Sequence, residues 1–306
     1  MFRAFFILLS ENRMLRAIAE RSAIGRRLSS RFVAGMTVHE ALDASAATNE
    51  RGMSVSVDNL GENVTNLEEA RESAQLYHDT IDEITERQLD ANVSLKLTHM
   101  GLDIDEAVSR TIVNEVVAHA AKRNNFVRID MEGSPYTQKT LDVVRELHGQ
   151  PGNAGHVGAV IQTYLHRSER DVEELCAEGI RIRLCKGAYK EPPEIAFQAK
   201  ADVDANFVKL MRILLKSGTY HGIATHDPKM IEATLAFARS ENIPPNAFEF
   251  QMLYGVRRDL QEQLVRDGWR MRVYIPFGTE WYPYLMRRLA ERPANAVFIL
   301  KNLFRR

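Results

Sequence analysis

Eight short runs of β-branched and apolar residues, each followed by a longer stretch with helical periodicity, fill the sequence from residue 53 onward. The runs lie at 53–58, 93–98, 126–132, 157–164, 180–187, 221–226, 247–253 and 271–278. The helical stretches lie at about 66–89, 103–123, 137–148, 168–178, 195–216, 228–240, 257–267 and 280–291. Alternation over short connections is typical of a parallel sheet, and eight such units predict an α/β fold of the closed (βα)₈ TIM-type barrel class.

A doubly wound sheet is the alternative architecture for such a pattern. No G-x-G-x-x-G follows any of the eight runs, so the dinucleotide fingerprint of that fold is missing. No linker rich in Pro, Gly or Ser divides the chain, so we expect residues 51–306 to form one catalytic barrel domain. Residues 1–50 are predicted to form a helical extension, and residues 294–306 a terminal helix. Helix-start signals occur at Asp103, at Ser168 and at Asp227 before Pro228.

Composition excludes several classes of function. The formal net charge of -1 gives the whole chain no electrostatic footprint for nucleic acid. The two cysteines, Cys176 and Cys185, form neither a metal pattern nor a disulfide framework, which suits a reducing, cytoplasmic compartment. No HExxH motif and no G-x-S-x-G elbow is present, so we expect no metal. No apolar run approaches the length that spans a bilayer.

The first 35 residues carry seven arginines against two acids, Glu11 and Glu20, and include the apolar run AFFILL at 4–9. One interpretation is a basic amphipathic helix that lies on the inner face of the cytoplasmic membrane, which would make the protein peripheral. The other is a helix that packs across the barrel or self-associates through its apolar face. Both interpretations stay open at this stage.

Polar or titratable residues follow nearly every predicted strand, where barrel enzymes place their chemistry. They are Asp58, Glu62, Lys96, Asp130, Glu132, Gln162, Tyr164, Arg183, Lys186, Tyr189, Thr225, His226, Gln251 and Tyr274. A structural network of ion pairs would explain part of the set. Because so many charges at one mouth are costly without partners or a ligand, the set as a whole predicts a binding site.

The segment after the last predicted strand adds two more cations. Tyr284, Arg287, Arg288 and Glu291 are spaced to share one helical face. A solvated face with one internal ion pair is the plainer interpretation. Two guanidiniums next to Lys96 and Arg183, however, suit bidentate binding of a carboxylate or phosphate. The residues alone therefore indicate a barrel enzyme acting on a small anion. A lyase with Lys96 as its Schiff-base lysine and a non-catalytic scaffold on a membrane surface remain alternatives.

Several segments together resemble the bacterial monofunctional proline dehydrogenases. The segments are LGE (60–62), SLKLT (94–98), IDME (129–132), VIQTY (160–164), RLCKGAY (183–189), ATH (224–226), EFQML (249–253) and YIPFGTEWYPYLMRRLAE (274–291). This resemblance implies a distorted (βα)₈ barrel that holds FAD without a covalent bond. It implies oxidation of L-proline to Δ1-pyrroline-5-carboxylate, with hydride passing from the ring carbon next to nitrogen to flavin N5 and electrons passing on to a membrane quinone.

The resemblance also implies residue roles. For the substrate these are a carboxylate clamp of Arg287, Arg288 and Lys96, and a wall of Asp130, Tyr189, Tyr274 and Tyr284. Arg183 matches an arginine beside flavin N5, and Glu62 matches a loop acid that pairs with Arg287 when the site closes. Contacts to FAD are implied for Met131, Gln162, Lys186, Gly187, Ala188, Thr225 and His226. Gly133, Cys185 and Asp227 depart from the family's usual residues beside these positions.

Overall fold

The computed structural model describes residue 22 and residues 29–61 and 64–291, and the side chains among them up to residue 286. Within this part the strands close into a barrel in sequential order, and every neighbouring pair is parallel. The strands are β1 (Ser54–Asn59), β2 (Ala91–Leu95), β3 (Val127–Ile129), β4 (Val157–Gln162), β5 (Arg181–Cys185), β6 (His221–Ala224), β7 (Phe248–Leu253) and β8 (Met271–Phe277). All eight predicted strands are confirmed, and so is the (βα)₈ barrel.

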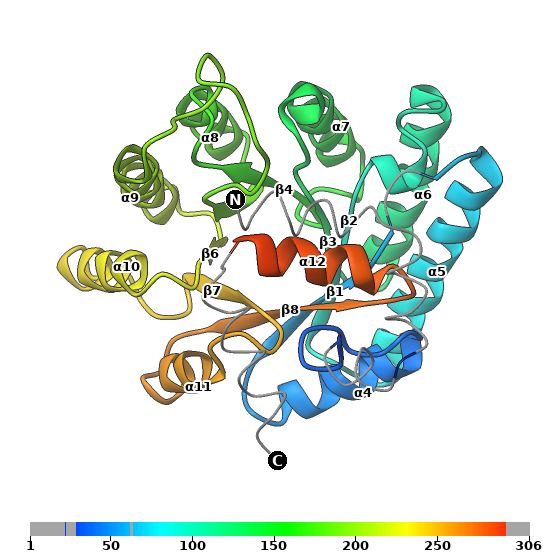
Figure 1. The fold of residues 1–306 in the computed structure, drawn as a ribbon, viewed down its shortest axis with the longest axis horizontal. Coiled ribbons are helices and arrows are strands. Elements are labelled where there is room, and N and C mark those ends of the chain that lie inside the picture. The colour runs from blue at the N-terminus through cyan, green and yellow to red at the C-terminus, as the bar shows by residue number, and fades with distance from the viewer. Residues whose placement is uncertain (1–21, 23–28, 62–63, 292–306) are drawn as a thin grey trace.

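Helices surround the strand ring (Figure 1). They are α4 (Val38–Asn49), α5 (Leu67–Glu86), α6 (Glu106–Lys122), α7 (Thr137–Gly149), α8 (Ser168–Ala177), α9 (Lys200–Lys216), α10 (Pro228–Ser240), α11 (Arg258–Arg266) and α12 (Trp281–Glu291). Two short 3₁₀ turns, η1 (Thr98–Met100) and η2 (Ser134–Tyr136), follow β2 and β3. The helix expected to begin near residue 195 begins only at Lys200.

Of the three helix-start signals in the sequence, one is a cap in the structure and two are not. Asp227 accepts from the N–H of Lys229 and caps α10 ahead of Pro228, as predicted. The cap of α6 is Asp105 and not Asp103, because η1 and a turn occupy residues 98–104. Ser168 is the first residue of α8 and not its cap.

The inside of this barrel is polar, and its apolar core lies between strands and helices. Side chains alternate along each strand, so Val55, Val57, Val93, Leu95 and their equivalents pack outward as one buried cluster. Most inward positions carry hydrogen-bonding groups instead of the branched aliphatic layers usual in this fold. Gly158 shows how tightly they fit, since a Cβ there would lie 2.7 Å from Nη1 of Arg128.

A second apolar cluster closes one end of the barrel. Helix α12, which follows β8, is seen in front of the strand ring in Figure 1. Its residues Trp281, Tyr284 and Leu285 pack with Phe32, Val33 and Leu60. Helix α4 covers β1 and β8, with Ala41 and Leu42 fully buried. Part of the predicted N-terminal extension therefore packs on the barrel itself, while residues 1–21 lie outside the described part.

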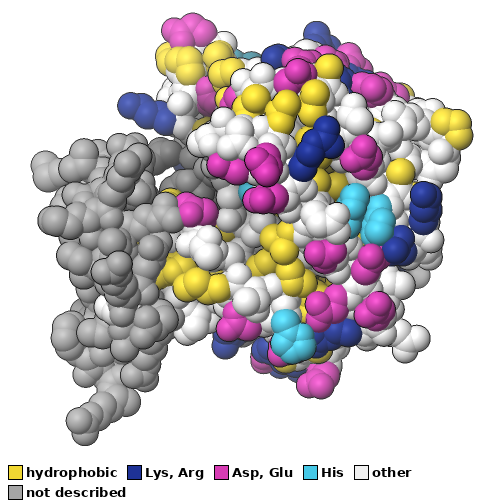
Figure 2. Space-filling view, turned by 90° about the vertical axis from the view of Figure 1, so that its right-hand side faces the viewer, with side chains coloured by type: hydrophobic (Ala, Val, Ile, Leu, Met, Phe, Trp, Pro, Cys, Tyr) yellow, Lys and Arg dark blue, Asp and Glu magenta, His cyan; other side chains and the backbone are white. Residues whose placement is uncertain are grey.

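The surface over α5 and α6 carries interspersed acidic and basic side chains (Figure 2). Arg123 and His119 both reach Asp82 across these two helices. Among the described residues, no helix is both long and apolar enough to cross a membrane.

Candidate active site

A buried network of four charges lies at the C-terminal ends of β1, β2, β3 and β5. Lys96 Nζ lies 3.3 Å from both carboxylate oxygens of Asp58 and 3.9 Å from Oδ2 of Asp130. Arg183 Nη1 donates to Oδ1 of Asp130 at 2.7 Å. Two cations thus face two carboxylates, and the parallel barrel brings together residues 34 to 125 positions apart in the chain. The sequence-based grouping of Lys96, Asp130 and Arg183 at one mouth is therefore seen in the structure.

Arg183 is held from several sides and is only 6% exposed. Its Nε donates to Oε1 of Gln251 at 2.5 Å, and its Nη groups donate to the hydroxyls of Ser94 and Ser56, both at 3.2 Å. A guanidinium with this many fixed acceptors cannot swing away, so its positive charge stays at the centre of the mouth.

Tyr274 completes the network from β8. Its hydroxyl donates to Oδ2 of Asp130 at 2.8 Å, and its ring centroid lies 5.1 Å from Cζ of Arg183. The strand runs on to Phe277, so Tyr274 lies within it and not at its end as expected. Its hydroxyl is hydrogen-bonded, and the residue still belongs to the mouth.

The pKa values of the two carboxylates of the network are shifted in opposite directions. Burial raises the pKa of Asp58 to about 6, which Lys96 opposes and Asp130 reinforces. Burial also acts to raise the pKa of Asp130, but the charges of Arg183 and Lys96 outweigh it and hold that pKa below its ordinary value. Burial chiefly raises the pKa of Tyr274 well above its usual range, so its hydroxyl stays protonated and can donate. Asp130 is therefore the more firmly ionised acid of the pair.

The residues expected to contact FAD follow β3, β4, β5 and β6, which are consecutive around the barrel. Met131 and Thr225 are each 7% exposed, and Gln162 donates to the backbone oxygen of Glu132 at 2.8 Å. His226 Nε2 accepts from the N–H of Leu253 at 2.9 Å, which in the neutral ring puts the proton on Nδ1. These residues occupy one continuous half of the mouth.

The turn after β5 is shaped by a close approach. Gly187 has a φ of +102°, and a Cβ there would lie 2.2 Å from the ring of Tyr164. The positive φ and the ring of Tyr164 therefore both require a glycine at this position. Ala188 and Tyr189 continue the same turn, and Tyr189 is 42% exposed.

Lys186 belongs to a compact ion-pair cluster beside this turn. Its Nζ lies 2.5 Å from Asp204 and 2.7 Å from Asp227, and Lys200 reaches the same two carboxylates. Burial acts to raise the pKa of Asp227, but Lys186 outweighs it and holds that pKa at about 2. A ligand phosphate would meet a lysine whose position is already fixed.

Three of the predicted site residues cannot be placed. Glu62 lies outside the described residues, and the side chains of Arg287 and Arg288 do as well, although both residues belong to α12. Tyr284 on the same helix is buried in the cluster with Phe32 and Leu60. The clamp and the gate therefore stay predictions. Among the described residues no group of histidines, cysteines and acids could hold a metal ion.

The sequence assigned no roles to Ser56, Ser94, Asp58 and Gln251, although they hold Lys96 and Arg183 in place. The sequence signal for such residues is the alternation of polar and apolar side chains along a strand. In SVSVD and NVSLK each polar residue occupies the inward position of a strand whose other residues are apolar. A serine at an inward barrel position is a candidate anchor for a neighbouring charge.

A closed barrel with a buried, charge-balanced network at its C-terminal mouth belongs to the class of (βα)₈ enzymes. A family model described as proline dehydrogenase matches residues 41–301. The chain is 41% identical over 301 residues to proline dehydrogenase 2 of Bacillus subtilis strain 168, covering 98% of each chain. It is 39% identical over 281 residues to proline dehydrogenase of Deinococcus radiodurans, covering 91% of this chain and 90% of that one.

The chain belongs to the proline dehydrogenase family, and the resemblance noted from its motifs is confirmed. Among solved structures it is similar to proline utilization A from Bdellovibrio bacteriovorus inactivated by N-propargylglycine. That similarity has a TM-score of 0.85 at 27% identity and covers 98% of this chain but 37% of the longer one. Membership in this family removes the lyase and the scaffold as interpretations of the mouth.

Proposed function

We propose that the mouth holds FAD without a covalent bond and that the chain oxidises L-proline to Δ1-pyrroline-5-carboxylate, with a membrane quinone as the final electron acceptor. The observation that carries the proposal is the buried network of Lys96, Asp58, Asp130, Arg183 and Tyr274. It combines a fixed cation for an anionic substrate, Lys96, with a guanidinium held at the barrel centre, that of Arg183. Such preorganised charge is the main means by which a protein promotes electron transfer to a bound cofactor.

The order of the strands favours a division of the mouth into two halves. Met131, Gln162, Lys186, Gly187, Ala188, Thr225 and His226 would hold FAD on the half formed by β3 to β6. The groups in this half include an amide, a lysine and an imidazole, and such donors fit the acceptor-rich flavin ring and pyrophosphate. When bound, the flavin supplies the two-electron acceptor for hydride from the ring carbon next to nitrogen. Arg183 lies between the halves, where its charge favours electron density arriving from the substrate side.

The other half, formed by β8, β1, β2 and helix α12, would bind the amino acid. Lys96, Arg287 and Arg288 would hold the carboxylate, and Tyr274 and Tyr284 would wall the ring together with Tyr189 from the turn after β5. Lys96 is kept in place by Asp58 at 3.3 Å. Asp130 orients Arg183 and the Tyr274 hydroxyl through one carboxylate. These residues bind and orient, and they bring the reacting atoms to the near-attack distance on which the rate depends.

Closure over the substrate would come from Glu62, which follows β1 and would pair with Arg287. A closed lid excludes water and strengthens every charge interaction inside the mouth. Glu62→Ala should then lower kcat/KM while FAD stays bound. Because only a neutral amine donates hydride readily, proline oxidation should also rise toward alkaline pH.

Anaerobic titration of the purified protein with L-proline tests the proposal. We expect a flavin absorption spectrum that bleaches with L-proline and does not bleach with D-proline, because inversion at the α-carbon turns the reacting carbon away from the flavin when the carboxylate stays in the clamp. Appearance of the cyclic imine, trapped with an aromatic amino-aldehyde, identifies the product. A protein that holds flavin but keeps its colour under excess L-proline would contradict the proposal.

The membrane part of the proposal rests on the basic segment 1–35, and it is tested separately. Deletion of residues 1–20 should abolish salt-sensitive co-sedimentation with anionic vesicles. Equal sedimentation of the full and shortened chains would assign the segment to packing or self-association instead.

A further inference from the structure

The N-terminal end of the barrel, opposite the active-site mouth, contains a polar hollow of about 300 Å³. A second hollow of about 270 Å³ adjoins it and shares Asp90, Arg181, Tyr220 and Arg272 with its lining. We call the two together the basal hollow. Its lining contains five arginines but only two carboxylates: Arg123, Arg128, Arg181, Arg270 and Arg272, with Asp90 and Glu249. The lining of the basal hollow therefore carries an excess of positive charge.

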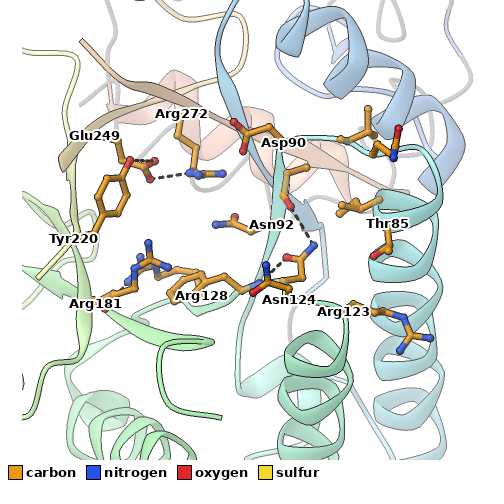
Figure 3. A pocket seen from close by; sticks show the side chains of 16 residues that line it. Thr85, Asp90, Asn92, Arg123, Asn124, Arg128, Arg181, Tyr220, Glu249 and Arg272 are labelled. Carbon is orange, nitrogen blue, oxygen red and sulfur yellow. Dashed lines mark hydrogen bonds and ion pairs between the residues drawn. The ribbon is translucent and has the colours of Figure 1, made fainter. Parts of the chain in front are cut away.

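Arg181, the first residue of β5, is held by aromatic rings and not by an acid. Its Cζ lies 4.8 Å from the ring centroid of Phe126 and 5.0 Å from that of Tyr220. Within the described part of the chain its guanidinium forms no hydrogen bond and no ion pair. Stacking against rings uses the faces of a guanidinium and leaves its N–H groups available at the edge. Figure 3 shows Arg181, Arg128 and Arg272 around the same hollow.

Arg128 is more deeply placed and is only 5% exposed. Its Nη1 donates to the backbone oxygens of Ala159 at 2.9 Å and of Arg181 at 2.6 Å. No carboxylate of residues 29–61 or 64–286 lies within ion-pair distance of it. Burial lowers the pKa of Arg128 well below its usual value, and the charges of Arg183 and Arg181 add to this effect. A buried cation without a counter-ion is costly, and an anion in the hollow would offset that cost.

The two carboxylates of the lining already accept hydrogen bonds from other side chains. Glu249 accepts from Arg272 Nε at 2.7 Å, from Gln251 Nε2 at 2.6 Å and from the Tyr220 hydroxyl at 3.0 Å. Asp90 accepts from the Ser54 hydroxyl at 2.6 Å. Neither acid lies within ion-pair distance of Arg128 or Arg181, so the charge of Glu249 acts on these two arginines only from farther away and offsets only part of the excess.

We propose that the basal hollow is a binding site for a small oxyanion with at least two negative charges, of the class of phosphates and dicarboxylates. Arg181 and Arg128 supply the unpaired guanidiniums, and a planar guanidinium edge matches two oxygens of one such group. Each of the two compartments, of about 300 and 270 Å³, lies near the lower end of the size of ligand pockets in proteins, which suits a small anion and not a whole nucleotide. This site is independent of proline oxidation, because it lies at the other end of the barrel.

Thermal unfolding of the flavin-loaded protein in inorganic phosphate tests the site, with ionic strength kept constant by chloride. The site variant is Arg181→Gln, which removes a half-buried side chain that forms no hydrogen bond. The matched control is Arg212→Gln, because Arg212 also stacks on an aromatic ring, Phe237 at 5.5 Å, but lies on α9 away from the hollow. A parallel titration with succinate distinguishes a phosphate site from a dicarboxylate site.

We expect a saturable rise in Tm for wild type and Arg212→Gln with at least one of the two anions. Arg181→Gln should require at least tenfold more of that anion for the same rise, and Arg181→Lys, which keeps charge without the fork, should lie between them. The proposal is overturned if neither anion gives a saturable rise in wild type. It is equally overturned if Arg181→Gln and Arg181→Lys both follow the wild-type curve.

Discussion

Arg181 and Arg183 lie two residues apart on β5 and point into the same barrel, yet their surroundings differ completely. Arg183 donates to Asp130, Gln251, Ser94 and Ser56, and nearby cations and carboxylates balance. Arg181 has aromatic rings in place of acids. The difference teaches that two arginines on one strand can have separate tasks. Under our proposals Arg183 is fixed beside a ligand of the mouth, and Arg181 offers its N–H groups to an anion in the basal hollow.

The two ends are nevertheless physically connected. Gln251 donates to Glu249 at 2.6 Å and accepts from Arg183 at 2.5 Å, so its amide joins the mouth to the basal hollow. Glu249 in turn holds Arg272. Gln251 therefore orients Arg183 from below while Asp130 orients it from the side. Experiments that separate the two ends must measure both stability and turnover.

Replacing each of the two arginines by glutamine should give the largest contrast. Arg183→Gln leaves Asp130 buried without its main cation, and loss of one partner of a buried ion pair costs about 3–5 kcal/mol of unfolding free energy. Arg181→Gln loses stacking on two rings but relieves repulsion with Arg128, so we expect a cost of about 1 kcal/mol or less in phosphate-free buffer. Urea unfolding measures both. Similar losses of unfolding free energy in the two variants would contradict the difference inferred between the two arginines.

Residue patterns predicted the strands well because buried parallel strands are short β-branched runs whose order along the chain is also their order in space. They missed the basal hollow for a definable reason. In a barrel the functional residues are expected after the strands, whereas Arg128, Arg181 and Arg272 stand near the starts of β3, β5 and β8. The alternation in VRID, RIRL and RMRV does place these arginines inward. Only the structure shows which of them have acids as partners, because that depends on barrel register.

The pH dependence of stability should have opposite sign at the two ends. The folded-state pKa of Asp58 is raised from 3.8 to about 6, so its stabilising contribution is complete below about 3.8 and is lost as pH rises through 6. The corresponding loss of unfolding free energy is on the order of 3 kcal/mol. The unfolding free energy of wild type should therefore fall relative to Asp58→Asn between about pH 4 and pH 7.

Glu249 is the matched acid of the basal hollow. Burial acts to raise its pKa, but Arg272 outweighs burial and holds it below 4.5. Its contribution is present above 4.5 and is lost as pH falls through the lower folded value. Wild type should thus lose stability relative to Glu249→Gln only below about pH 4.5. Parallel pH profiles for the two variant pairs would contradict the assignment.

Carboxylate recognition should depend on the clamp at the mouth. Arg288→Lys keeps the charge but loses the planar fork, so we expect KM for L-proline to rise by tens-fold, roughly 2 kcal/mol, with flavin content unchanged. Arg287→Lys should behave in the same way. Steady-state kinetics and flavin absorbance measure the two quantities. An unchanged KM in both variants would remove the clamp from α12 and leave Lys96 as the main anion contact of the mouth.

The smallest expected effect concerns Tyr274, where the role of the ring can be separated from that of the hydroxyl. Its hydroxyl is committed to Asp130 at 2.8 Å, and its ring lies beside Arg183. A ring wall fitted to an unsubstituted pyrrolidine leaves no partner for an added hydroxyl, so wild type should prefer L-proline over trans-4-hydroxy-L-proline. Tyr274→Phe keeps the wall and loses only the hydrogen bond, and Tyr274→Ser removes the wall.

We therefore expect Tyr274→Phe to lower kcat/KM for both substrates by about tenfold, since a hydrogen bond to a charged group contributes about 1.5–3 kcal/mol and part of that is recovered by Ser94 and Arg183 at Asp130. Its preference for proline should stay near the wild-type ratio. Tyr274→Ser should narrow that ratio by about tenfold, through loss of proline efficiency and relief of the clash. If Tyr274→Phe narrows the ratio as much as Tyr274→Ser does, then the hydroxyl and its bond to Asp130 select the substrate, and the ring does not.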